Sequence, residues 1–267
     1  MWYFSNDNSP PVIQPGSCIQ SKYSNTEIPA LPSKAVVFCL GKGLPVLEER
    51  FSTCLLMEEL PGFITHSKVL RVSEHPDVCF LHGGYGSPQI ACTMETLHAL
   101  GVTEAFLIGL CGGFGEDTQV GAILLPEKIW SEEGCSRHYY EAPRFAQVNS
   151  PRPLSKLAEF LEKRGFCVRL KNTVTTDAVY RQTYYKEALW RKMGCEAVDM
   201  EASAFVSLCN YYGMKSTVAL MVSDRHPLHE GDPAWVWGSD SFRETRDDFI
   251  AACVSFSLKN EEEENHG

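Results

Sequence analysis

Residues 197–204 read Ala-Val-Asp-Met-Glu-Ala-Ser-Ala and lie where a short apolar strand should give way to a helix. Asp199 and Glu201 are then close to a helix N-terminus, where backbone N–H groups lack partners within the helix. A carboxylate in that position can hold two hydroxyl groups of a sugar, and Met200 offers a soft apolar surface for a ring. The segment therefore indicates a small-molecule site at the end of a strand.

A second acidic strand end follows the next predicted helix. Residues 221–224 read Met-Val-Ser-Asp, an apolar strand that ends in a carboxylic acid. In open α/β sheets, ligands bind in the crevice at the carboxyl ends of the strands. We therefore expect Glu201 and Asp224 to meet in one crevice. The alternative is that Asp224 is a cap or turn acid, and that Glu201 serves only the helix dipole.

Apolar strands and amphipathic helices alternate along the rest of the chain. Strands are expected at residues 35–40, 69–72, 78–81, 105–109, 122–125, 128–130, 168–175, 197–198 and 216–222. Helices are expected at residues 45–58, 87–100, 153–163, 201–212 and 239–257. This alternation predicts an α/β fold: a single-domain three-layer α/β/α structure with a central mixed, mostly parallel twisted sheet.

Composition divides the 267 residues into three predicted parts. Residues 1–33 are rich in Pro, Ser, Asn and Gln and should form an irregular N-terminal arm. Residues 34–258 should form the α/β domain, and residues 259–267 an acidic, disordered tail. The formal net charge is −10, which argues against nonspecific binding to nucleic acid or to an anionic membrane.

The eleven cysteines are spread singly and form no Cys-x-x-Cys pair. This pattern favours buried, reduced thiols in a cytoplasmic protein, with Cys111 as the one expected to line a pocket. Since no cluster has metal-ligand spacing, no metal site is predicted. The chain contains no apolar run long enough to span a membrane and no signal-peptide pattern at its start.

Three glycine-rich segments, at residues 41–43, 83–86 and 109–115, each follow an apolar strand. Glycine lets backbone N–H groups line a concave nest for an anion or a polar ligand. None of the three fits the Walker pattern or a dinucleotide fingerprint. Each alone could be an ordinary tight turn, but three at one end of a sheet predict a ligand site.

Other side chains could complete such a site. A partly buried Asp224 should have a raised pKa and could donate a proton. Tyr180 and Arg181 follow a strand end and could flank a planar base. His82, His138 and His226 are each more typical of packing or surface histidines.

The order of these motifs resembles the nucleoside phosphorylase superfamily. The motifs are Gly-Leu-Cys-Gly-Gly at 109–113, Ser-Glu-Glu-Gly-Cys-Ser-Arg-His-Tyr at 131–139, Thr-Thr-Asp-Ala-Val-Tyr-Arg at 175–181, Val-Asp-Met-Glu-Ala at 198–202 and Val-Ser-Asp at 222–224. That family includes purine nucleoside and uridine phosphorylases and the methylthioadenosine and adenosylhomocysteine nucleosidases. The resemblance covers about residues 35–258, nearly the whole chain.

The resemblance implies a role for each motif. Asp224 would protonate a purine base at N7 as the catalytic acid. Glu201 would bind the ribose hydroxyls beside Met200, and His138 would lie near the sugar, reaching across a subunit contact. The implied base-binding residues are Val179, Tyr180, Arg181, Cys111 and Gly112. The implied phosphate or water site consists of Gly41, Lys42, Gly86, Gly109 and Leu110.

The phosphate end departs from the family pattern. Pro45 stands where the loop after the first strand should carry an arginine, and Leu107 stands where a second arginine is expected. Leu110 replaces a phosphate-binding Ser or Thr. Each charge-assisted contact to an anion contributes about 1.5–3 kcal/mol. The sequence therefore predicts a weakened phosphate site.

Three functions remain open on these residues. The first is cleavage of the N-glycosidic bond of a nucleoside, preferably a purine nucleoside, by hydrolysis or by atypical phosphorolysis. The second is true phosphorolysis, with Lys42 and either Arg137 or Arg181 as substitute cations. The third is nucleoside binding without catalysis. No cofactor is expected, although inorganic phosphate would be the co-substrate of a phosphorylase. The resemblance also predicts a homo-oligomer, either a dimer, a trimer or a hexamer.

Overall fold

The computed structural model describes residues 9–22, 30–62, 66–140, 144–237 and 240–259. The helices in this part of the chain are α1 Pro15–Lys22, α2 Gly43–Arg50, α3 Ser87–Ala99, α4 Leu154–Glu162, α5 Tyr184–Lys192, α6 Ala202–Tyr211 and α7 Asp240–Ser257, with 3₁₀ helices η1 Cys135–His138 and η2 Val179–Arg181. The strands are β1 Lys34–Cys39, β2 Thr53–Met57, β3 Val69–Val72, β4 His75–His82, β5 Glu104–Gly113, β6 Ile123–Leu124, β7 Lys128–Ser131, β8 Phe145–Gln147, β9 Val168–Arg169, β10 Asn172–Thr175, β11 Cys195–Asp199 and β12 Lys215–Arg225.

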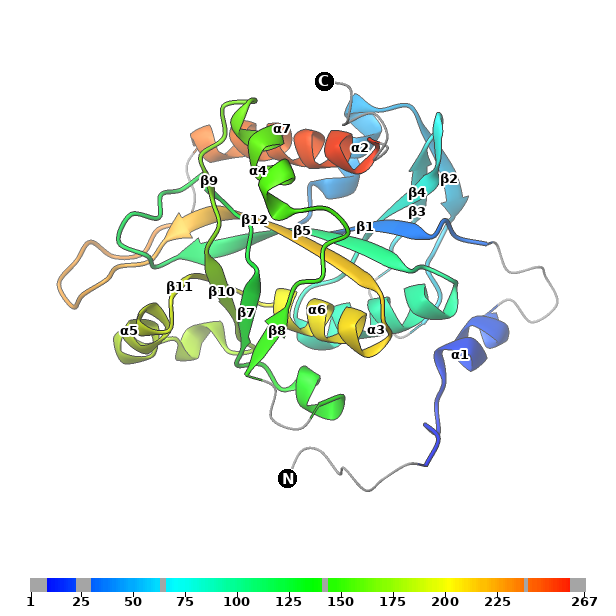
Figure 1. The fold of residues 1–267 in the computed structure, drawn as a ribbon, viewed down its shortest axis with the longest axis horizontal. Coiled ribbons are helices and arrows are strands. Elements are labelled where there is room, and N and C mark those ends of the chain that lie inside the picture. Colours follow the sequence, from blue (N-terminus) through cyan, green and yellow to red (C-terminus); the bar gives the residue numbers. More distant parts are fainter. Residues whose placement is uncertain (1–8, 23–29, 63–65, 141–143, 238–239, 260–267) are drawn as a thin grey trace.

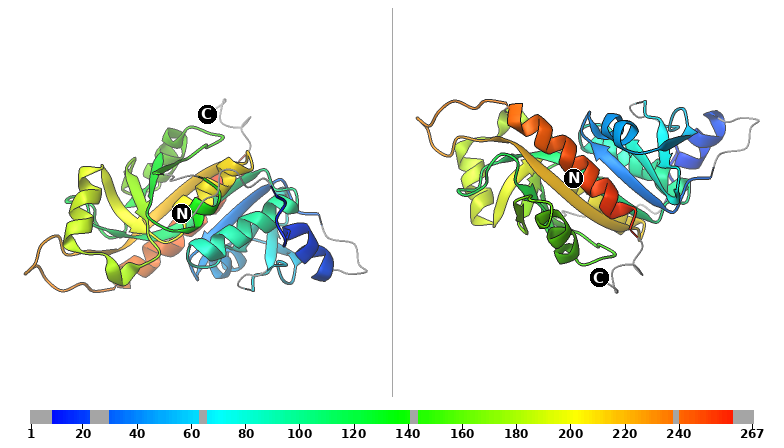
Figure 2. Two further views of the ribbon diagram at one scale, coloured as in Figure 1. Left: turned by 90° about the horizontal axis from the view of Figure 1, so that it is seen from below. Right: turned by 90° about the horizontal axis from the view of Figure 1, so that it is seen from above.

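All these strands belong to one mixed, twisted sheet, as predicted (Figures 1 and 2). The sheet runs in the order β2-β3-β4-β1-β5-β11-β10-β7-β8. β5 is its centre, because β1 and β12 both pair with β5 in parallel. The end of β5 also pairs antiparallel with β11 at Gly112 and Gly113. These pairings bring the segments that follow β1, β11 and β12 to one region of the sheet.

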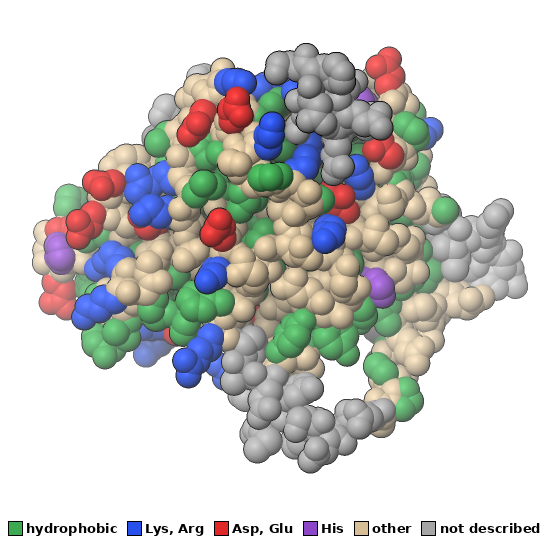
Figure 3. Space-filling model, viewed as in Figure 1, with side chains coloured by type: hydrophobic (Ala, Val, Ile, Leu, Met, Phe, Trp, Pro, Cys, Tyr) green, Lys and Arg blue, Asp and Glu red, His purple; other side chains and the backbone are tan. Residues whose placement is uncertain are grey.

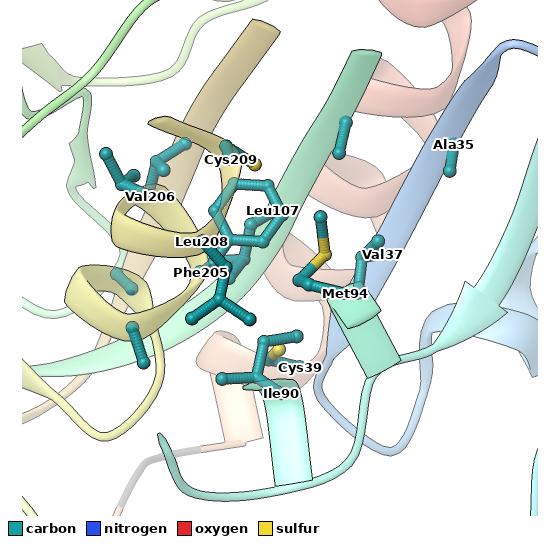
Figure 4. Close-up of a cluster of buried hydrophobic side chains, with 14 of the residues drawn as sticks. Ala35, Val37, Cys39, Ile90, Met94, Leu107, Phe205, Val206, Leu208 and Cys209 are labelled. Atoms are coloured by element: carbon teal, nitrogen blue, oxygen red, sulfur yellow. The ribbon is translucent and has the colours of Figure 1, made fainter. Parts of the chain in front are cut away.

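Helices cover both faces of the sheet, which gives the predicted three layers (Figure 1). Along β1, Ala35, Val37 and Cys39 pack in the cluster that contains α3 and α6. The alternate residues Val36 and Phe38 pack with α2, α4 and α7 on the other face. This period of two is the ordinary alternation of side chains along a strand. In Figure 4, Met94 and Ile90 of α3 lie among the side chains of Phe205 and Leu107.

One predicted helix is wrong in its second half. Residues 45–58 were expected to be helical throughout, but α2 ends at Arg50 and the chain continues as β2. The run Thr-Cys-Leu-Leu-Met suits a strand, and it pairs antiparallel with β3. Tertiary pairing here outweighs the helical spacing of the leucines. The predicted hairpin of β3 and β4 is confirmed.

Two other strand boundaries differ from the prediction, and they matter for the site. β5 continues through Leu110, Cys111 and Gly112, so these residues lie in a strand rather than in a glycine-rich turn. β12 continues to Arg225, so Asp224 lies within a strand rather than after one. The parallel pairing of β5 with β12 extends to these residues, with a register shift between Val222 and Asp224. Residues 168–175 form two strands rather than one, because β9 pairs with β6 whereas β10 pairs with β7 and β11.

The N-terminal arm is not wholly irregular. It contains the helix α1, in which Ile19 is buried, and Lys22 forms a 2.8 Å ion pair with Glu59. Contacts with α3 hold α1 against the domain. The predicted acidic tail at residues 259–267 lies outside the described residues except for Lys259.

The surface carries both signs of charge. Lys and Arg side chains are interspersed with Asp and Glu over the coloured part of the face in Figure 3. Among the described residues, no helix is both long enough and apolar enough to cross a membrane.

Candidate active site

A cavity of about 1400 Å³ opens where β1, β11 and β12 end. The turn after β1, the second half of β5, the turn from β11 to α6 and the end of β12 line it. Residues of η2, α5 and the segment 227–237 line it as well. Since ligand pockets commonly enclose about 300–1,000 Å³, this cavity has room for a nucleoside-sized ligand.

The cavity brings together most of the residues that the sequence predicted for the site. The predicted residues that line it are Asp224, Glu201, Met200, Val179, Tyr180, Cys111, Gly112, Gly41, Lys42 and Leu110. The predicted residues that are not among its lining are His138, Arg181, Gly86 and Gly109.

At one end of the cavity, Asp199 organises the turn into α6. Its Oδ1 accepts hydrogen bonds from the backbone N–H groups of Glu201 (2.8 Å) and Ala202 (2.7 Å) and from the Thr175 hydroxyl (2.8 Å). These contacts satisfy N–H groups that a helix N-terminus leaves unpaired. Asp199 therefore fixes the backbone on which Glu201 is mounted.

Glu201 is held from the opposite side by Gly86, whose backbone N–H donates to Glu201 Oε1 at 2.6 Å. Gly86 thus acts on the cavity through Glu201 even though it does not line it. Gly86 has φ of 82°, a left-handed conformation that favours glycine. This conformation lets the chain turn from β4 into α3 with the N–H group aimed at the carboxylate.

Burial is the main cause of the pKa shifts of both acids at this end of the cavity. Burial raises the pKa of Glu201 to about 8, and the nearby charge of Asp199 adds to the shift. Burial likewise raises the pKa of Asp199 to about 6, against the hydrogen bonds that it accepts. Asp199 Oδ2 is buried with no hydrogen-bond partner among the described residues. This end of the cavity therefore has unused capacity for polar groups of a ligand, such as sugar hydroxyls.

Asp224 lies in the same cavity and is surrounded by donors. Its Oδ1 accepts from the Ser223 hydroxyl at 2.6 Å, and its Oδ2 accepts from the indole N–H of Trp235 at 2.7 Å. His226 Nε2 lies 3.3 Å from the same Oδ2. Burial acts to raise the pKa of Asp224, but these hydrogen bonds outweigh burial and hold the pKa below its ordinary value. The prediction of a raised pKa is therefore wrong, because the three donors stabilise the carboxylate.

His226 is the imidazole that contacts Asp224. Its Nδ1 lies 2.7 Å from Glu187 Oε1, so the imidazole is bound between two carboxylates. Burial acts to lower the pKa of His226, but the hydrogen bonds to Asp224 and Glu187 outweigh it and raise the pKa to about 9. The sequence predicts a packing or surface histidine at position 226 and gives no expectation for Glu187 or Trp235. The closeness of Asp224 and His226 in the sequence was the available signal, since His226 directly follows the end of β12.

Gly112 has a steric role in this arrangement. A Cβ at Gly112 would collide with Nε2 of His226 and lie 3.2 Å from Oδ2 of Asp224. Only a residue without a side chain leaves room for the imidazole to reach the carboxylate.

We predict that Gly112→Ala lowers the free energy of unfolding by about 1–3 kcal/mol, since overpacking a filled site displaces its neighbours. Thermal unfolding of the variant measures this loss. Gly16→Ala is the matched control, because no atom lies within 4 Å of a Cβ built there. A melting temperature for Gly112→Ala equal to that of the unsubstituted protein would contradict the steric role.

The predicted phosphate end is largely apolar. Leu40, Pro45 and Leu110 line the cavity beside Gly41 and Lys42. Lys42 and Arg246 are the lysine and arginine among its described lining residues. Arg246 forms a 2.7 Å ion pair with Asp247. Lys42 is therefore the better placed cation for an anionic ligand here, and its side chain is exposed.

The predicted base-binding residues of η2 lie at the mouth of the cavity. Tyr180 is 97% exposed and Val179 is 40% exposed. Trp235 and Trp237 also line the cavity, with their rings 6.1 Å apart. These aromatic side chains offer faces against which a planar base could stack. Arg181 follows in η2 and does not line the cavity.

The remaining predicted residues are placed elsewhere. Gly109 lies within β5, and a Cβ there would lie 3.1 Å from Leu220. His138 ends η1, which lies against α3 and α6. The prediction that His138 reaches the sugar of a neighbouring subunit stays a prediction. No group of three His, Cys, Asp or Glu side chains suited to a metal ion occurs in the described part of the chain.

Known proteins resemble this chain in sequence. The family model described as the phosphorylase superfamily matches residues 41–257. A DeoD-type purine nucleoside phosphorylase of Clostridium novyi (strain NT) is 28% identical over 142 residues, 53% of this chain and 61% of that protein. The match thus spans less than two thirds of that relative's length. Another DeoD-type purine nucleoside phosphorylase, from Alkaliphilus metalliredigens (strain QYMF), is 24% identical over 177 residues, 66% of this chain and 72% of that protein.

The fold is also similar to that of a solved structure. The crystal structure of purine nucleoside phosphorylase from Toxoplasma gondii in complex with immucillin-H superposes with a TM-score of 0.69 at 18% identity. The superposition covers 85% of this chain and 92% of that one. At this identity, the likeness establishes the three-layer fold.

Proposed function

Because the chain belongs to the phosphorylase superfamily, we propose that it cleaves the N-glycosidic bond of a purine nucleoside. The observation that carries the proposal is that Glu201 and Asp224 line the same cavity. In this proposal Glu201, at the start of α6, is the sugar-binding acid and Asp224, in β12, is the base-binding acid. This is the arrangement that such a reaction needs, since the sugar must be held while the base departs.

In the proposed reaction, Glu201 binds the ribose hydroxyls on the backbone frame set by Asp199 and Gly86. Asp224 faces the base and stabilises it as it gains a proton at N7. The bond between C1′ and N9 breaks with its electron pair passing to the base, which leaves positive charge on the sugar.

We further propose that water is the nucleophile. Leu40, Pro45 and Leu110 line the end of the cavity to which we assign phosphate, and of the lysine and arginine among the described lining residues Arg246 is paired with Asp247, which leaves Lys42 to hold the anion. An anion bound there would lack two or three charge-assisted contacts, each worth about 1.5–3 kcal/mol. Phosphate affinity should accordingly be low, and water can reach C1′ in its place.

The test is to incubate the protein with inosine and guanosine in phosphate-free buffer and again with added phosphate. We expect base release at the same rate in both, with free ribose as the product. A rate that depends strictly on phosphate, with ribose 1-phosphate as the product, would contradict hydrolysis. Nucleoside binding with no base release in either buffer would contradict catalysis altogether and favour a binding protein.

Lys42 favours a second candidate, atypical phosphorolysis. Lys42 follows Gly41 after β1 and lines the cavity, and its charge could replace the missing arginines in part. Under this alternative, Lys42→Gln lowers the phosphate-dependent rate and leaves any phosphate-independent rate unchanged. The same assay on this variant therefore separates the two candidates.

We also propose that residues 34–258 act as one nucleoside-binding domain and that the protein is a homo-oligomer. The family match across residues 41–257 supports the first of these proposals. Sedimentation equilibrium tests the second, and a monomer at working concentration would contradict it.

A further inference from the structure

In the proposed cleavage Asp224 meets the base, whereas its neighbours His226 and Glu187 have no assigned role. His226 Nδ1 is 2.7 Å from Glu187 Oε1, and His226 Nε2 is 3.3 Å from Asp224 Oδ2. Glu187 is 5% exposed and Asp224 is 4% exposed. Two buried carboxylates on opposite sides of an imidazole stabilise its protonated form, since both ring nitrogens then donate.

Three elements fix the imidazole in this position. The backbone N–H of His226 donates to the Gly113 carbonyl of β5 at 2.8 Å. Glu187 comes from α5, and Asp224 comes from β12. The absence of a side chain at Gly112 provides the space in which His226 approaches Asp224. The contact between His226 and Asp224 is thus fixed by the backbone positions of β5 and β12.

The charged groups around His226 come from several elements of the fold. Glu187 faces it from α5, and Asp224 faces it from β12 with Ser223 as a further donor to that carboxylate. Trp235, in the segment 227–237, donates a hydrogen bond to Asp224. The ring of Phe114, which directly follows β5, lies 6.5 Å from the imidazole, measured between ring centroids. Arg225 is directed away, toward the carbonyl groups of Thr118 and Glu116. The charged groups that directly contact the imidazole are therefore both carboxylates.

We propose that His226 supplies the proton that the departing base receives, passing it through Asp224 while Glu187 holds the imidazole in place. This inference rests on the proposed nucleoside cleavage. His226 and Glu187 act through Asp224 and are positioning residues, and Asp224 is the group that meets the base. The raised pKa of His226, about 9, agrees with this role because it keeps the proton on the imidazole at neutral pH.

The proton transfers balance. The proton on His226 Nε2 moves to Asp224 Oδ2, and a proton moves from Asp224 to N7 of the base as the C1′–N9 bond breaks. His226 is left neutral, with its Nδ1–H donating to Glu187. Water adds to C1′ and releases one proton to solvent, from which His226 is protonated again. No oxidant, metal ion or further reactant is required.

The decisive test compares guanosine with 7-methylguanosine as substrates. The methylated base already carries a positive charge at N7 and can leave without receiving a proton there. We expect His226→Gln to lower kcat for guanosine by about 10- to 100-fold, as loss of one proton-transfer group typically does. For 7-methylguanosine, we expect the kcat of the same variant to be within about threefold of that of the unsubstituted protein. This loss is much smaller than the loss expected when a needed general acid is removed.

Glu187→Gln provides a second, milder variant. Removing one carboxylate lowers the pKa of His226, so kcat/KM for guanosine should begin to fall at a lower pH than in the unsubstituted protein, whose activity should fall near pH 9. Glu159→Gln on the surface of α4 is the control and should leave the pH profile unchanged. Thermal unfolding checks that each variant is folded at the assay temperature.

The outcomes separate the two proposals. Equal losses on both substrates in His226→Gln, with an unshifted pH profile in Glu187→Gln, would overturn the proton role while leaving nucleoside cleavage intact. Failure of the unsubstituted protein to cleave either substrate would instead overturn the proposed function, and the proton role with it.

Discussion

Asp224→Asn should lower kcat for guanosine by about 10²- to 10⁴-fold and change KM little. The amide cannot relay a proton, although it has the same shape as the carboxylate. Its NH₂ group would also face the donors Trp235 and His226, which now share Oδ2. Steady-state kinetics with saturating guanosine measure the loss.

The matched control for this variant is Asp248→Asn. Asp248 is an exposed acid that pairs with Arg50 at 2.7 Å on the surface. An exposed ion pair contributes little to stability, about 0–1 kcal/mol, so activity should be unaffected. If Asp224→Asn kept a third or more of the original kcat, the acid would not take part in the reaction.

Glu201→Gln should have two opposite effects. It should lower kcat/KM by about 100-fold, because two hydrogen bonds from ribose hydroxyls to the Glu201 carboxyl would be lost, each worth about 0.5–1.5 kcal/mol. It should also stabilise the unliganded protein at alkaline pH. Burial, together with the charge of Asp199, raises the folded-state pKa of Glu201 to about 8, so ionising it in the folded protein is costly.

The sign of the pH dependence follows from proton linkage. Between the ordinary pKa of a glutamate, about 4.3, and about 8, the folded protein binds more protons at Glu201 than the unfolded chain does. The contribution of Glu201 to stability therefore falls as the pH rises through this range. Glutamine has no charge to bury. The melting temperature of Glu201→Gln should thus match that of the unsubstituted protein near pH 5 and exceed it near pH 9.

At the alkaline end, the difference should be roughly 4 °C or more, since each kcal/mol shifts the melting temperature by about 2–4 °C in a chain near this size. Glu159→Gln, which removes an exposed carboxyl from α4, is the control and should show no such dependence. A constant difference between Glu201→Gln and the unsubstituted protein at pH 5 and pH 9 would show that Glu201 is not a costly buried charge.

The sequence was sufficient to predict the three-layer fold and the meeting of Glu201 with Asp224. Both inferences depend on local pattern: strands alternate with helices, and acids follow two apolar runs. The helix predicted at β2 is wrong because Leu55 and Leu56 are compatible with a helical face in the sequence alone. In the folded protein, this segment pairs with β3. Whether such a segment forms a helix or a strand depends on pairing with a distant segment. The spacing of residues within the segment itself gives no information about that pairing.

The protonation of the site could not be predicted in the same way. Asp224 was expected to be a neutral acid because burial alone raises a carboxyl pKa. The groups that reverse this effect come from distant parts of the chain. Trp235 lies on the segment after β12, and Glu187, which fixes His226, lies on α5. A site's charge state is set by the sum of its neighbours, and most of these are neighbours only in the folded protein.

The hydrogen bond from the indole of Trp235 to Asp224 bears on the turnover rate of the protein. Asp224 Oδ2 already accepts from Trp235 at 2.7 Å and faces His226 at 3.3 Å, which uses both lone pairs of that oxygen. A base that engages Oδ2 must displace one of these two donors, and where it displaces the indole, entry and exit require a movement of the segment that bears Trp235. Such a movement limits turnover whenever it is slower than bond cleavage. Solvent viscosity slows the movement and leaves the bond-breaking step unchanged, so the viscosity dependence of kcat distinguishes which of the two sets the rate.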